Sequence, residues 1–432
     1  MVSYTKIEEL LDDDAVGKEF SVRAWVYRER SSGGVKFLVL RDSTDVIQAA
    51  VKKDKVSARA WKMAESARVE SSVIVSGVVV KDARAPNGFE LQATDFATIQ
   101  AAEPFPIAKD NSEEWFLDIR HLSIRSRELT AVMKVKHSLL EACREFFKNK
   151  GYWETTPPII VSGACEGGST LFEFDYFGKK AFLSQSAQLY LEALIYSLEK
   201  VYSITPSFRA EKSRTVRHLA EYWHVEGEEA HMNFEQLLEF EEQLVSFACH
   251  KVARERGKEL RFLGRDPKEL LEVKPPFQRI SYSEAVELLR GKGAQVEWGD
   301  DFGVEEERLL TQDLKKPVFV VRHPKTFKAF YMKEDPEDER LVLSNDCLAP
   351  EGFGEIIGGS QREDSVEALT ARLRANGQKP EDFKWYLDLR RYGSVPHSGF
   401  GMGVERVLRW ICKLNHIRDA IPFPRVINRS YP

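Results

Sequence analysis

The chain has 432 residues, of which 43% are hydrophobic and 30% charged, and this composition excludes a largely disordered protein. Its length allows two or three domains. The formal net charge of −5 gives no general attraction to nucleic acid, so any such binding requires local basic patches. The five cysteines include no CxxC pair, which argues against a disulfide framework and a cysteine-type zinc site and favours a reducing compartment.

The N-terminal stretch MVSYTKIEELLDDDAVG is acidic where a signal or transit peptide would be basic and apolar. No apolar run in the chain approaches the ~18 residues that a membrane span requires. We therefore expect a cytoplasmic protein with no membrane segment.

Residues 1–102 are predicted to form a β-barrel domain. Five runs rich in β-branched and aromatic residues are separated by turn residues: FSVRAWVYRE, KFLVLRD, VIQAAV, SSVIVSGVVVK and FELQATDFATIQ. A helical pattern, VSARAWKMAESAR, follows the third run. This is the element order of an OB-fold, which commonly binds oligonucleotides, although other small barrels share the pattern.

Residues 103–125 are predicted to be a linker or hinge, because the stretch AAEPFPIAKDNSEEW contains prolines and no clear period. Residues 126–432 are predicted to form an α+β domain. It begins with the amphipathic helix ELTAVMKVKHSLLEACREFFKNKG, which is capped by Gly151. Further helices are predicted at 188–200, 235–257, 281–290, 363–376 and 402–414, and strands at 201–209, 222–230, 318–322, 329–333 and 354–359. Because regular βαβ units are not seen, an antiparallel sheet is favoured over a Rossmann sheet.

The stretch FRAEKSRTVRHLAEYWHVEGEEAH, residues 208–231, places opposite charges among aromatic and apolar residues. Its two ends are predicted strands joined by a polar loop, and alternate residues from Tyr222 to Glu228 share one face of the second strand. Such a hairpin could hold a polyanion, since Arg209 and Arg217 can each pair with phosphate oxygens at two points. The alternative is an exposed hairpin of ion pairs, each worth ~0–1 kcal/mol.

The stretch HSGFGMGVERVLRW contains Gly399, Gly401 and Gly403 and leads into a helix that begins near Val404. Glycines allow a ligand to approach the backbone closely, and a helix N-terminus favours anions. The alternative is a tight strand-to-helix turn. Arg406 lies in the first turn of this helix, where a cation opposes the macrodipole. We therefore expect Arg406 to have a negatively charged or aromatic partner.

The stretch SNDCLAPEGFGEIIGGSQRED places Asp346 and Glu355 on either side of a Pro-Glu-Gly turn. Mg²⁺ prefers a few carboxylates together with phosphate oxygens, so these two residues are predicted magnesium ligands. The alternative is a solvated acidic loop.

Together these stretches resemble the motifs of class II aminoacyl-tRNA synthetases, over nearly the whole chain. FRAE…RHLAEYWHVEGE (about 205–230) is similar to motif 2, GFGMGVERVLRW (about 399–414) to motif 3, and ACREFFKNKGYWETTPPII (within about 131–160) to motif 1. The motif order with an N-terminal barrel resembles the aspartyl/asparaginyl/lysyl subgroup. The resemblance implies a catalytic antiparallel sheet of six to seven strands flanked by helices, a homodimer formed through motif 1, ATP with Mg²⁺, and an OB-fold that reads a tRNA anticodon.

The resemblance also implies roles for the residues of motif 2. Arg209 corresponds to the arginine on the ATP α-phosphate and the substrate carboxylate, and Glu211 to the carboxylate that reads the adenine amino group. Arg217 and His218 occupy positions that contact the β- and γ-phosphates, and Tyr222 a position that stacks on adenine.

Arg406 in motif 3 corresponds to the residue on the other face of adenine and at the γ-phosphate. It is the second predicted catalytic residue, after Arg209. Asp346 and Glu355 resemble the magnesium ligands. Some relatives add a serine three positions after the glutamate, but this chain has Gly358 there.

The implied reaction is the attack of an amino-acid carboxylate on the α-phosphorus of ATP with release of pyrophosphate, followed by transfer of the acyl group to the 3′-terminal ribose of tRNA. It requires positioning and charge neutralisation rather than a catalytic base.

The choice of amino acid depends on charge in the substrate pocket. The stretch SQSAQLYLEA resembles SPQLYKQ of the aspartyl members, whose lysine pairs with the substrate side chain, and here that position is Leu191. An unpaired buried carboxylate is costly, so the missing lysine disfavours aspartate. Glu226, where aspartyl members tend to carry aspartate, is expected to accept a hydrogen bond from an amide nitrogen.

The remaining contacts to the amino acid follow from the same resemblance. Arg362 is expected to donate to the side-chain carbonyl oxygen of the substrate. Glu166 and Gln188 are expected to bind its ammonium group. We therefore expect L-asparagine as the amino acid and tRNA(Asn) as its acceptor.

Three alternatives stay open. An aspartyl enzyme, including one that charges both aspartate and asparagine tRNAs, is disfavoured by Leu191. A paralogue that amidates activated aspartate would lack the barrel. A catalytically silent RNA-binding relative could lose Arg209, Glu211 or Arg406, and all three are present.

In the barrel, the resemblance places Phe37 where an aromatic ring stacks on the central anticodon base and Gln48 where an amide reads the edge of that base. Stacking of this kind is worth ~1–3 kcal/mol per base. Arg28 is expected to contact the same loop. The alternatives are a barrel-core role for Phe37 and a solvated position for Gln48.

Overall fold

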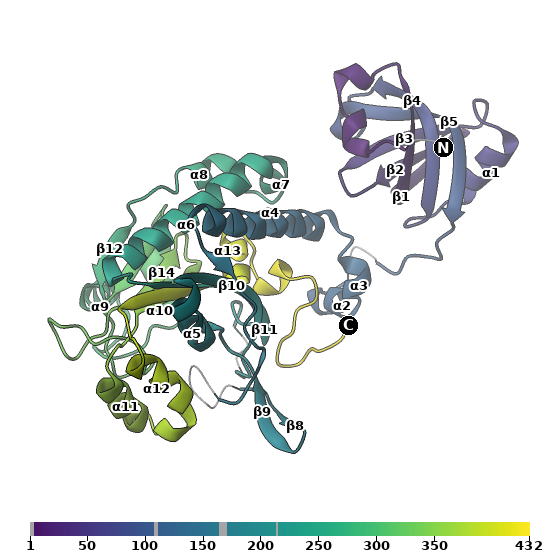
Figure 1. The fold of residues 1–432 in the computed structure, drawn as a ribbon. Coiled ribbons are helices and arrows are strands. Elements are labelled where there is room, and N and C mark those ends of the chain that lie inside the picture. The colour runs from purple at the N-terminus through teal and green to yellow at the C-terminus, as the bar shows by residue number, and fades with distance from the viewer. Residues whose placement is uncertain (1–3, 108–110, 164–170, 213–214) are drawn as a thin grey trace. The chain divides into compact units, whose positions relative to one another are not determined.

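The computed structural model describes residues 4–107, 111–163, 171–212 and 215–432. The chain divides into two compact units, Met1–Ser112 and Glu113–Pro432 (Figure 1). The predicted linker, residues 103–125, spans this division. Its second half contains two short helices, α2 (Glu113–Asp118) and α3 (Arg120–Ser123).

The first unit is a closed five-stranded barrel with the strand order β1-β2-β3-β5-β4. The strands are β1 (Glu19–Ser32), β2 (Val35–Arg41), β3 (Val46–Lys52), β4 (Ser72–Lys81) and β5 (Phe89–Gln100), and helix α1 (Ala58–Ser66) lies between β3 and β4. Alternate strand residues such as Leu38 and Leu40 are buried in the barrel, because successive side chains of a strand point to opposite faces. The predicted OB-fold with a helix after the third strand is confirmed.

The second unit is built on an eight-stranded sheet with the order β12-β13-β14-β15-β16-β11-β10-β6. The strands are β12 (Gln278–Ser281), β13 (Val318–Val321), β14 (Ser344–Ala349), β15 (Gly354–Gln361), β16 (His397–Gly403), β11 (Glu221–Ala230), β10 (Lys200–Phe208) and β6 (Trp153–Glu154). Neighbouring strands are antiparallel except at the two edges, where β12 pairs with β13 and β6 with β10 in parallel. The predicted antiparallel α+β domain is confirmed, with short parallel edge strands that extend the sheet to eight.

Three helices, α4 (Arg127–Asn149), α6 (Phe234–Glu255) and α13 (Val404–Ile411), pack on one face of this sheet (Figure 1). Their apolar residues share a single core with the strands. In it the ring of Phe147 from α4 stacks on that of Tyr202 from β10, with centroids 4.2 Å apart.

The opposite face of the sheet is polar at its centre. On β11, Val225 belongs to the helix-covered core, whereas Glu226 and Glu228 point the other way. Gly227 contributes to the covered face, where a Cβ atom would lie 3.0 Å from Phe400 and 3.2 Å from Phe147. Helix α5 (Gln188–Leu198) packs against β10 and β11. The period of two therefore separates the hydrophobic core from a row of carboxylates.

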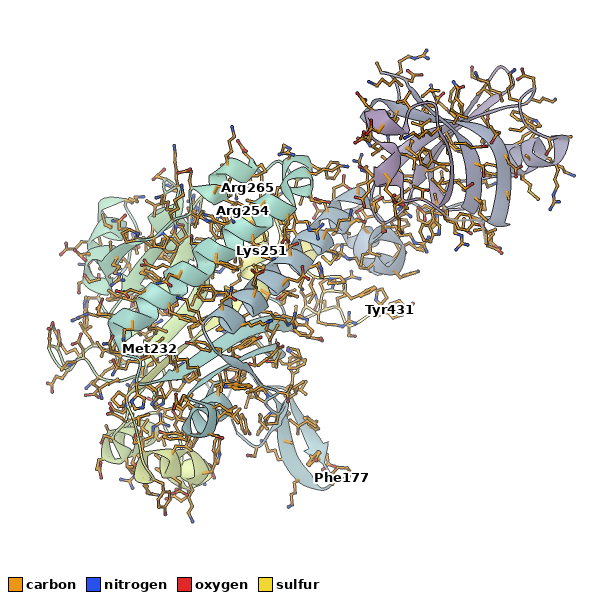
Figure 2. The ribbon with its side chains drawn as sticks, turned by 45° about the horizontal axis from the view of Figure 1, so that its top comes forward. Phe177, Met232, Lys251, Arg254, Arg265 and Tyr431 are labelled. Atoms are coloured by element: carbon orange, nitrogen blue, oxygen red, sulfur yellow. The ribbon has the colours of Figure 1, made fainter. Side chains whose placement is uncertain are left out.

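The other described elements surround this sheet. They are α7 (Gly257–Phe262), α8 (Pro267–Leu271), α9 (Tyr282–Gly291), α10 (Val304–Thr311), α11 (Val366–Ala375), α12 (Lys384–Arg391), β7 (Ile160–Val161), β8 (Glu173–Tyr176) and β9 (Lys179–Leu183). Strands β7, β9 and β8 form a small separate sheet. Figure 2 shows Phe177 at the tip of the β8–β9 hairpin, where 91% of the residue is exposed.

The predicted strand at 329–333 is wrong. This segment makes only an isolated bridge, between Met332 and Arg362. The carbonyl groups of Lys328, Ala329 and Met332 instead accept hydrogen bonds from the guanidinium group of Arg372 on α11. Elsewhere in the segment the Tyr331 carbonyl accepts from the Glu363 N–H and the Lys333 N–H donates to the Gln361 carbonyl. A side chain thus satisfies part of this backbone in place of a regular strand. Strand β14, which carries Asp346, was not predicted.

In the described part of the chain, no helix is both long and apolar enough to span a bilayer.

Candidate active site

A cavity of about 600 Å³ lies on the polar face of the eight-stranded sheet. Its lining includes six of the predicted site residues: Gln188, Arg209, Glu226, Asp346, Glu355 and Arg362. A smaller adjoining pocket is lined by five: Arg209, Arg217, His218, Tyr222 and Arg406. Arg209 and His224 line both. The structure therefore brings these predicted ATP and amino-acid residues together around Arg209, whereas Glu211 and Leu191 line neither pocket.

The β10–β11 hairpin and its loop present Arg209, Arg217, His218 and Tyr222 to the smaller pocket. The Arg209 guanidinium carbon lies 5.9 Å from the centre of the Tyr222 ring. The Glu211 carboxylate lies 3.8 Å from Arg209 and 3.7 Å from His218. Burial, reinforced by the positive charge of Arg406, lowers the pKa of His218. The pocket thus has an aromatic side and a strongly cationic side, as an adenine base and phosphates require.

Arg406 lies in the first turn of α13, and its guanidinium group donates to Glu355 Oε2 at 2.6 Å. The predicted negative partner of Arg406 is thus confirmed. Burial alone would raise the pKa of Glu355, but Arg406 and further nearby cations hold it below its usual range. Strand β15 therefore presents Glu355 to the cavity as a carboxylate.

Asp346 on β14 is also held as a carboxylate. Lys328 Nζ lies 2.8 Å and 3.1 Å from its two oxygens, and His323 Nε2 lies 3.2 Å from Oδ2. Burial opposes ionisation of Asp346, but Lys328 and His323 outweigh it and lower the pKa. Lys328 and His323 were not anticipated, because they come from a segment between β13 and β14 that carries no motif.

The two carboxylates fit the oxygen ligands that Mg²⁺ prefers. They lie on neighbouring strands at the position of Gly358, where a Cβ atom would be 3.4 Å from Glu355 Oε1 and 3.7 Å from Asp346 Oδ1. The glycine keeps this space open. Each carboxylate already forms an ion pair with a cation, Asp346 with Lys328 and Glu355 with Arg406. Both positions therefore favour a positively charged ligand.

Arg217 makes a contact that the sequence did not suggest. Both of its terminal nitrogens donate to Glu307 on α10, at 2.6 Å each, and the pair is buried. Glu307 also accepts from the backbone N–H of Glu355 at 2.6 Å. Helix α10 belongs to residues 258–317, an insert between the motifs whose role the sequence does not explain beyond bracing the sheet. Through Glu307, helix α10 links the hairpin loop to β15. Contact between Arg217 and phosphate stays a prediction.

At the other end of the cavity, Arg362 is held by a partner that the sequence analysis did not select. Its guanidinium group donates to both oxygens of Glu228, at 3.0 Å and 2.9 Å, and to Ser360 Oγ at 2.6 Å. Glu226, predicted to accept from a substrate amide, accepts from the Ser186 hydroxyl and from the Ala187 N–H. Glu228 lies two residues after Glu226 on β11 and therefore on the same face of the strand. This alternation of side chains along a strand was the signal that could have identified Glu228.

The other predicted amino-acid residues differ in position. Gln188 lines the cavity, and its Nε2 donates to Glu192 Oε1 at 3.0 Å. Leu191 is fully buried in an apolar cluster with Ile195 and Val201. Leu191 can therefore affect substrate choice by lacking a charge rather than by lining the pocket. Glu166 falls outside the described residues.

His224 lies where the two pockets meet. Its Nδ1 is 3.2 Å from the Ser207 hydroxyl and 3.7 Å from the Glu226 carboxylate. Burial, assisted by Arg209 and Arg406, lowers the pKa of His224 to about 3. The imidazole is therefore neutral at physiological pH and adds no charge to the pocket.

In the barrel, the predicted anticodon residues lie on β1, β2 and β3. Phe37 is half-buried, with the guanidinium carbon of Arg30 at 4.4 Å from its ring centre, and Arg28 is exposed. Gln48 is buried and donates to Glu90 Oε2 at 2.7 Å. Thus Phe37 does not belong to the barrel core and Gln48 is not solvated, while their contacts with a base stay predictions.

Comparisons with known proteins agree with this geometry. Residues 112–427 match the family model described as tRNA synthetases class II (D, K and N), and residues 20–99 match that of an OB-fold nucleic acid binding domain. The chain is 53% identical over 417 residues to the asparagine–tRNA ligase of Thermococcus kodakarensis, covering 96% of each chain. It is 47% identical to that of Thermoplasma acidophilum, covering 99% of each.

Solved structures give the same result. The asparaginyl-tRNA synthetase of Pyrococcus horikoshii complexed with asparaginyl-adenylate superposes with a TM-score of 0.96 at 51% identity, with all of both chains covered. A putative aspartyl-tRNA synthetase of Leishmania major superposes with a TM-score of 0.86 at 25% identity, with 100% of this chain and 95% of that chain covered. The chain belongs to the class II tRNA synthetases of the D, K and N group.

Proposed function

We propose that this chain is an asparagine–tRNA ligase. It activates L-asparagine with ATP to asparaginyl-adenylate and pyrophosphate, and transfers asparagine to the 3′-terminal ribose of tRNA(Asn). The observation that carries this proposal is the position of Arg209, which lines both the cationic ATP pocket and the cavity that contains Arg362 and Glu226. The high identity to asparagine–tRNA ligases over nearly the whole chain supports asparagine as the substrate.

Arg209 is the group that aligns the two reactants. Its guanidinium group can pair with the amino-acid carboxylate on one side and the α-phosphate on the other, which brings the nucleophilic oxygen to phosphorus. The substrate carboxylate is already ionised at neutral pH, so no general base is needed. Arg209 and Arg406 stabilise the charge that develops on the phosphate oxygens.

The smaller pocket holds the nucleotide. Adenine stacks on Tyr222 with Arg406 on its other face, and Glu211 accepts a hydrogen bond from the adenine amino group. Arg217 and His218 face the β- and γ-phosphates. Tyr222, Arg406, Arg217 and His218 all line this pocket, and the Glu211 carboxylate lies 3.7 Å from His218, which supports the assignment.

Mg²⁺ is the second requirement of the proposed reaction, with Asp346 and Glu355 as its protein ligands. When bound, Mg²⁺ neutralises phosphate charge and orients the polyphosphate for in-line attack. Lys328 and Arg406, which pair with these carboxylates, must give up or share their partners when the ion binds.

The amino-acid end recognises an uncharged side chain. Arg362 donates to the asparagine carbonyl oxygen and Glu226 accepts from its amide nitrogen. Gln188 and Glu166 bind the ammonium group. Leu191 supports this assignment because its apolar surroundings supply no cation for an aspartate carboxylate.

The tRNA is held by the barrel, with Phe37 stacking on the central anticodon base and Gln48 and Arg28 nearby. The chain also forms a homodimer through motif 1. Strand β6 of that motif lies at the edge of the sheet, and its Trp153 is 61% exposed, which is typical of an interface residue. A sedimentation mass of two 49.5 kDa chains would support the dimer.

ATP–pyrophosphate exchange with asparagine and aspartate offered separately tests the function. We expect exchange to depend on asparagine and on Mg²⁺, and a transcript of tRNA(Asn) to accept the activated amino acid. Exchange stimulated by aspartate and not by asparagine would establish the alternative, an aspartyl-tRNA synthetase. The Arg209→Lys variant serves as a control, because it keeps the charge but loses the two-point geometry, and it should lose about 10²–10³ in kcat.

A further inference from the structure

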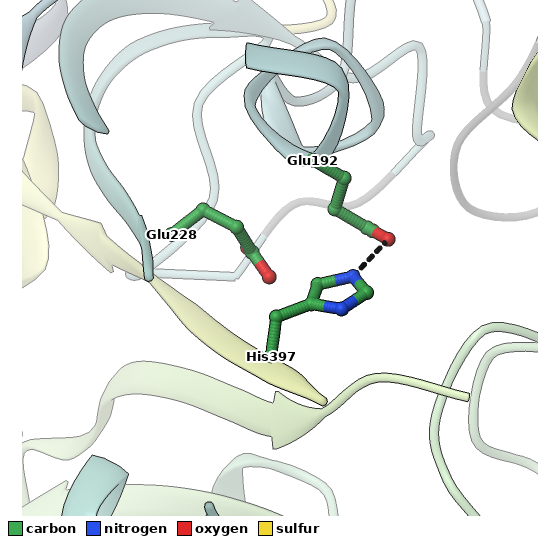
Figure 3. Close-up of side chains that lie close together, drawn as sticks. All are labelled: Glu192, Glu228 and His397. Atoms are coloured by element: carbon green, nitrogen blue, oxygen red, sulfur yellow. Dashed lines mark hydrogen bonds and ion pairs between the residues drawn. The ribbon is translucent and has the colours of Figure 1, made fainter. Parts of the chain in front are cut away.

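A buried cluster of charged side chains lies next to the amino-acid end of the cavity. Glu192 on α5, Glu228 on β11 and His397 on β16 place their polar atoms within 4.8 Å of one another (Figure 3). Such a group could suggest a metal site. The carboxylates, however, already face cations, since Arg362 pairs with Glu228 and Arg390 on α12 pairs with Glu192. The cluster is therefore an ion-paired network.

Glu192 is the centre of this network. Its Oε2 accepts from Arg390, from the Tyr386 hydroxyl at 2.7 Å, and lies 3.0 Å from His397 Nε2. Its Oε1 accepts from Gln188 Nε2 at 3.0 Å. The carboxylate has no exposed surface. Burial alone would raise the pKa of Glu192, but Arg390, His397 and Arg362 outweigh burial and lower it.

Two of the residues around Glu192 line the substrate cavity. Gln188 contacts it directly, and Arg362 Nε lies 4.0 Å from Glu192 Oε1. Because a carboxylate can only accept hydrogen bonds, it fixes the amide of Gln188 with Nε2 towards itself. The Oε1 of Gln188 is then left as an acceptor for a substrate ammonium group.

The charges of the network cancel in pairs. Arg362 is matched by Glu228 and Arg390 by Glu192, so these two ion pairs together have no net charge. If Glu192 were uncharged, Arg390 would leave one positive charge uncompensated beside the cavity. Such a charge would attract the side-chain carboxylate of aspartate and would add little for the neutral amide of asparagine.

We propose that Glu192 is a positioning residue for amino-acid selection: it cancels the charge of Arg390 beside the pocket, so that asparagine is favoured over aspartate. The inference rests on the proposed function, because it concerns the substrate of the same site. Glu192 is not among the residues that line the two pockets, so it acts through Gln188 and Arg362.

The test replaces Glu192 with its uncharged isostere. In the Glu192→Gln variant we expect the ratio of kcat/KM for asparagine to kcat/KM for aspartate, measured by ATP–pyrophosphate exchange, to fall by about tenfold or more. The Tyr386→Phe variant is the matched control. It removes a hydrogen bond to Glu192 without changing the charge, so its ratio should stay close to that of the unmodified chain.

A second variant tests the sign of the effect. Arg390→Gln leaves Glu192 uncompensated, so the ratio should rise, and the double variant Glu192→Gln with Arg390→Gln should return it towards the starting value. A merely structural role would weaken activation of both amino acids equally in every variant. The Arg390→Gln variant decides the question if Glu192→Gln does not fold.

Two outcomes are distinguishable. An unchanged ratio in a Glu192→Gln variant that still activates asparagine would overturn the inference and leave the proposed function intact. A preference of the unmodified chain for aspartate would overturn the proposed function, whatever the variants do.

Discussion

Arg217 and Glu307 form a buried two-point ion pair, with both N–O distances at 2.6 Å. The pair joins the loop of the β10–β11 hairpin to helix α10, and the Glu355 N–H is bonded to the same carboxylate. Gly354 lies directly behind the pair with φ at +78°, and a Cβ atom there would overlap both side chains. The smaller pocket, to which ATP is assigned in the proposed function, is thus supported by a segment outside the three motifs.

Removing the charge of Glu307 should destabilise this support. Glu307→Gln leaves the buried guanidinium group of Arg217 without its counterion, so we expect the free energy of unfolding to fall by about 3 kcal/mol and KM for ATP to rise. Urea unfolding and exchange at varied ATP concentration measure the two effects. Glu305→Gln is the control on the same helix, because Glu305 pairs with Arg308 at the surface and should change neither quantity. Equal effects of the two variants would contradict this role.

Two glycines of β16 should respond differently to alanine. A Cβ atom at Gly399 would overlap the Glu228 carboxylate and the Gly227 carbonyl oxygen, whereas at Gly401 its nearest contacts, in Glu226 and His224, are 3.7 Å away. We expect Gly399→Ala to lower the free energy of unfolding by about 2 kcal/mol and to displace Glu228 from Arg362.

The Gly401→Ala variant should fold normally. Its methyl group would project into the substrate cavity, which Gly401 lines, so the expected effect is a higher KM without a loss of stability. Thermal unfolding and exchange kinetics separate the two outcomes. If the Gly399→Ala variant is as stable as the unmodified chain and has an unchanged KM for asparagine, the prediction that the overlap with Glu228 is costly is wrong.

Phe37 provides a test of the barrel. Phe37→Ala should weaken binding of tRNA(Asn) about 10- to 100-fold, because stacking contributes about 1–3 kcal/mol per base. Phe37→Tyr keeps the ring and should bind normally. Neither variant should affect ATP–pyrophosphate exchange without tRNA, since Phe37 lies in the other compact unit. Filter binding of a tRNA transcript measures the affinity, and normal binding by Phe37→Ala would exclude the stacking role.

His224 should make stability depend on pH. Its pKa is lowered from 6.5 to about 3 by burial together with Arg209 and Arg406. Below pH 6.5 the unfolded chain takes up a proton that the folded chain does not bind until about pH 3. The contribution of neutral His224 to the free energy of unfolding is therefore fully present above pH 6.5 and is lost as the pH falls towards 3.

The size of this dependence can be isolated with His224→Gln. Below pH 6.5, the free energy of unfolding of the unmodified chain should fall by about 1 kcal/mol per pH unit because of His224, and this part of the fall should be absent in the variant. His121→Gln, at an exposed histidine, should keep the slope of the unmodified chain. Urea unfolding followed by tryptophan fluorescence at several pH values measures it. Identical slopes in all three proteins would show that His224 is not responsible.

Several features could be predicted from the sequence because they depend on short-range patterns. The period of two gave the barrel strands and the polar face of β11, and helical spacing gave α4, α5, α6, α9, α11 and α13 within a few residues. The unfavourable place of Arg406 in the first turn of its helix predicted a negative partner, and Glu355 fills that role. Motif order predicted which side chains converge around the two pockets.

Other features required contacts between distant segments. Leu191 has the sequence position of a pocket residue, but packing turns it into a fully buried apolar cluster. The segment 329–333 has strand-like residues, yet Arg372, about 40 residues away, satisfies the carbonyl groups of Ala329 and Met332. Spacing along the chain contains no information on which partner wins such a competition.

The sequence by itself determined the fold class, because this follows from local periodicity and from residue types. The resemblance to the synthetase motifs implied the neutral character of the amino-acid pocket, through Leu191 at the position of a lysine. Only the tertiary structure decided which charges neutralise one another. Glu307 reaches Arg217 across 90 residues and Glu192 reaches Arg390 across 198. The energy of a buried charge depends on the cations and anions within a few ångströms, and folding, rather than sequence order, places them there.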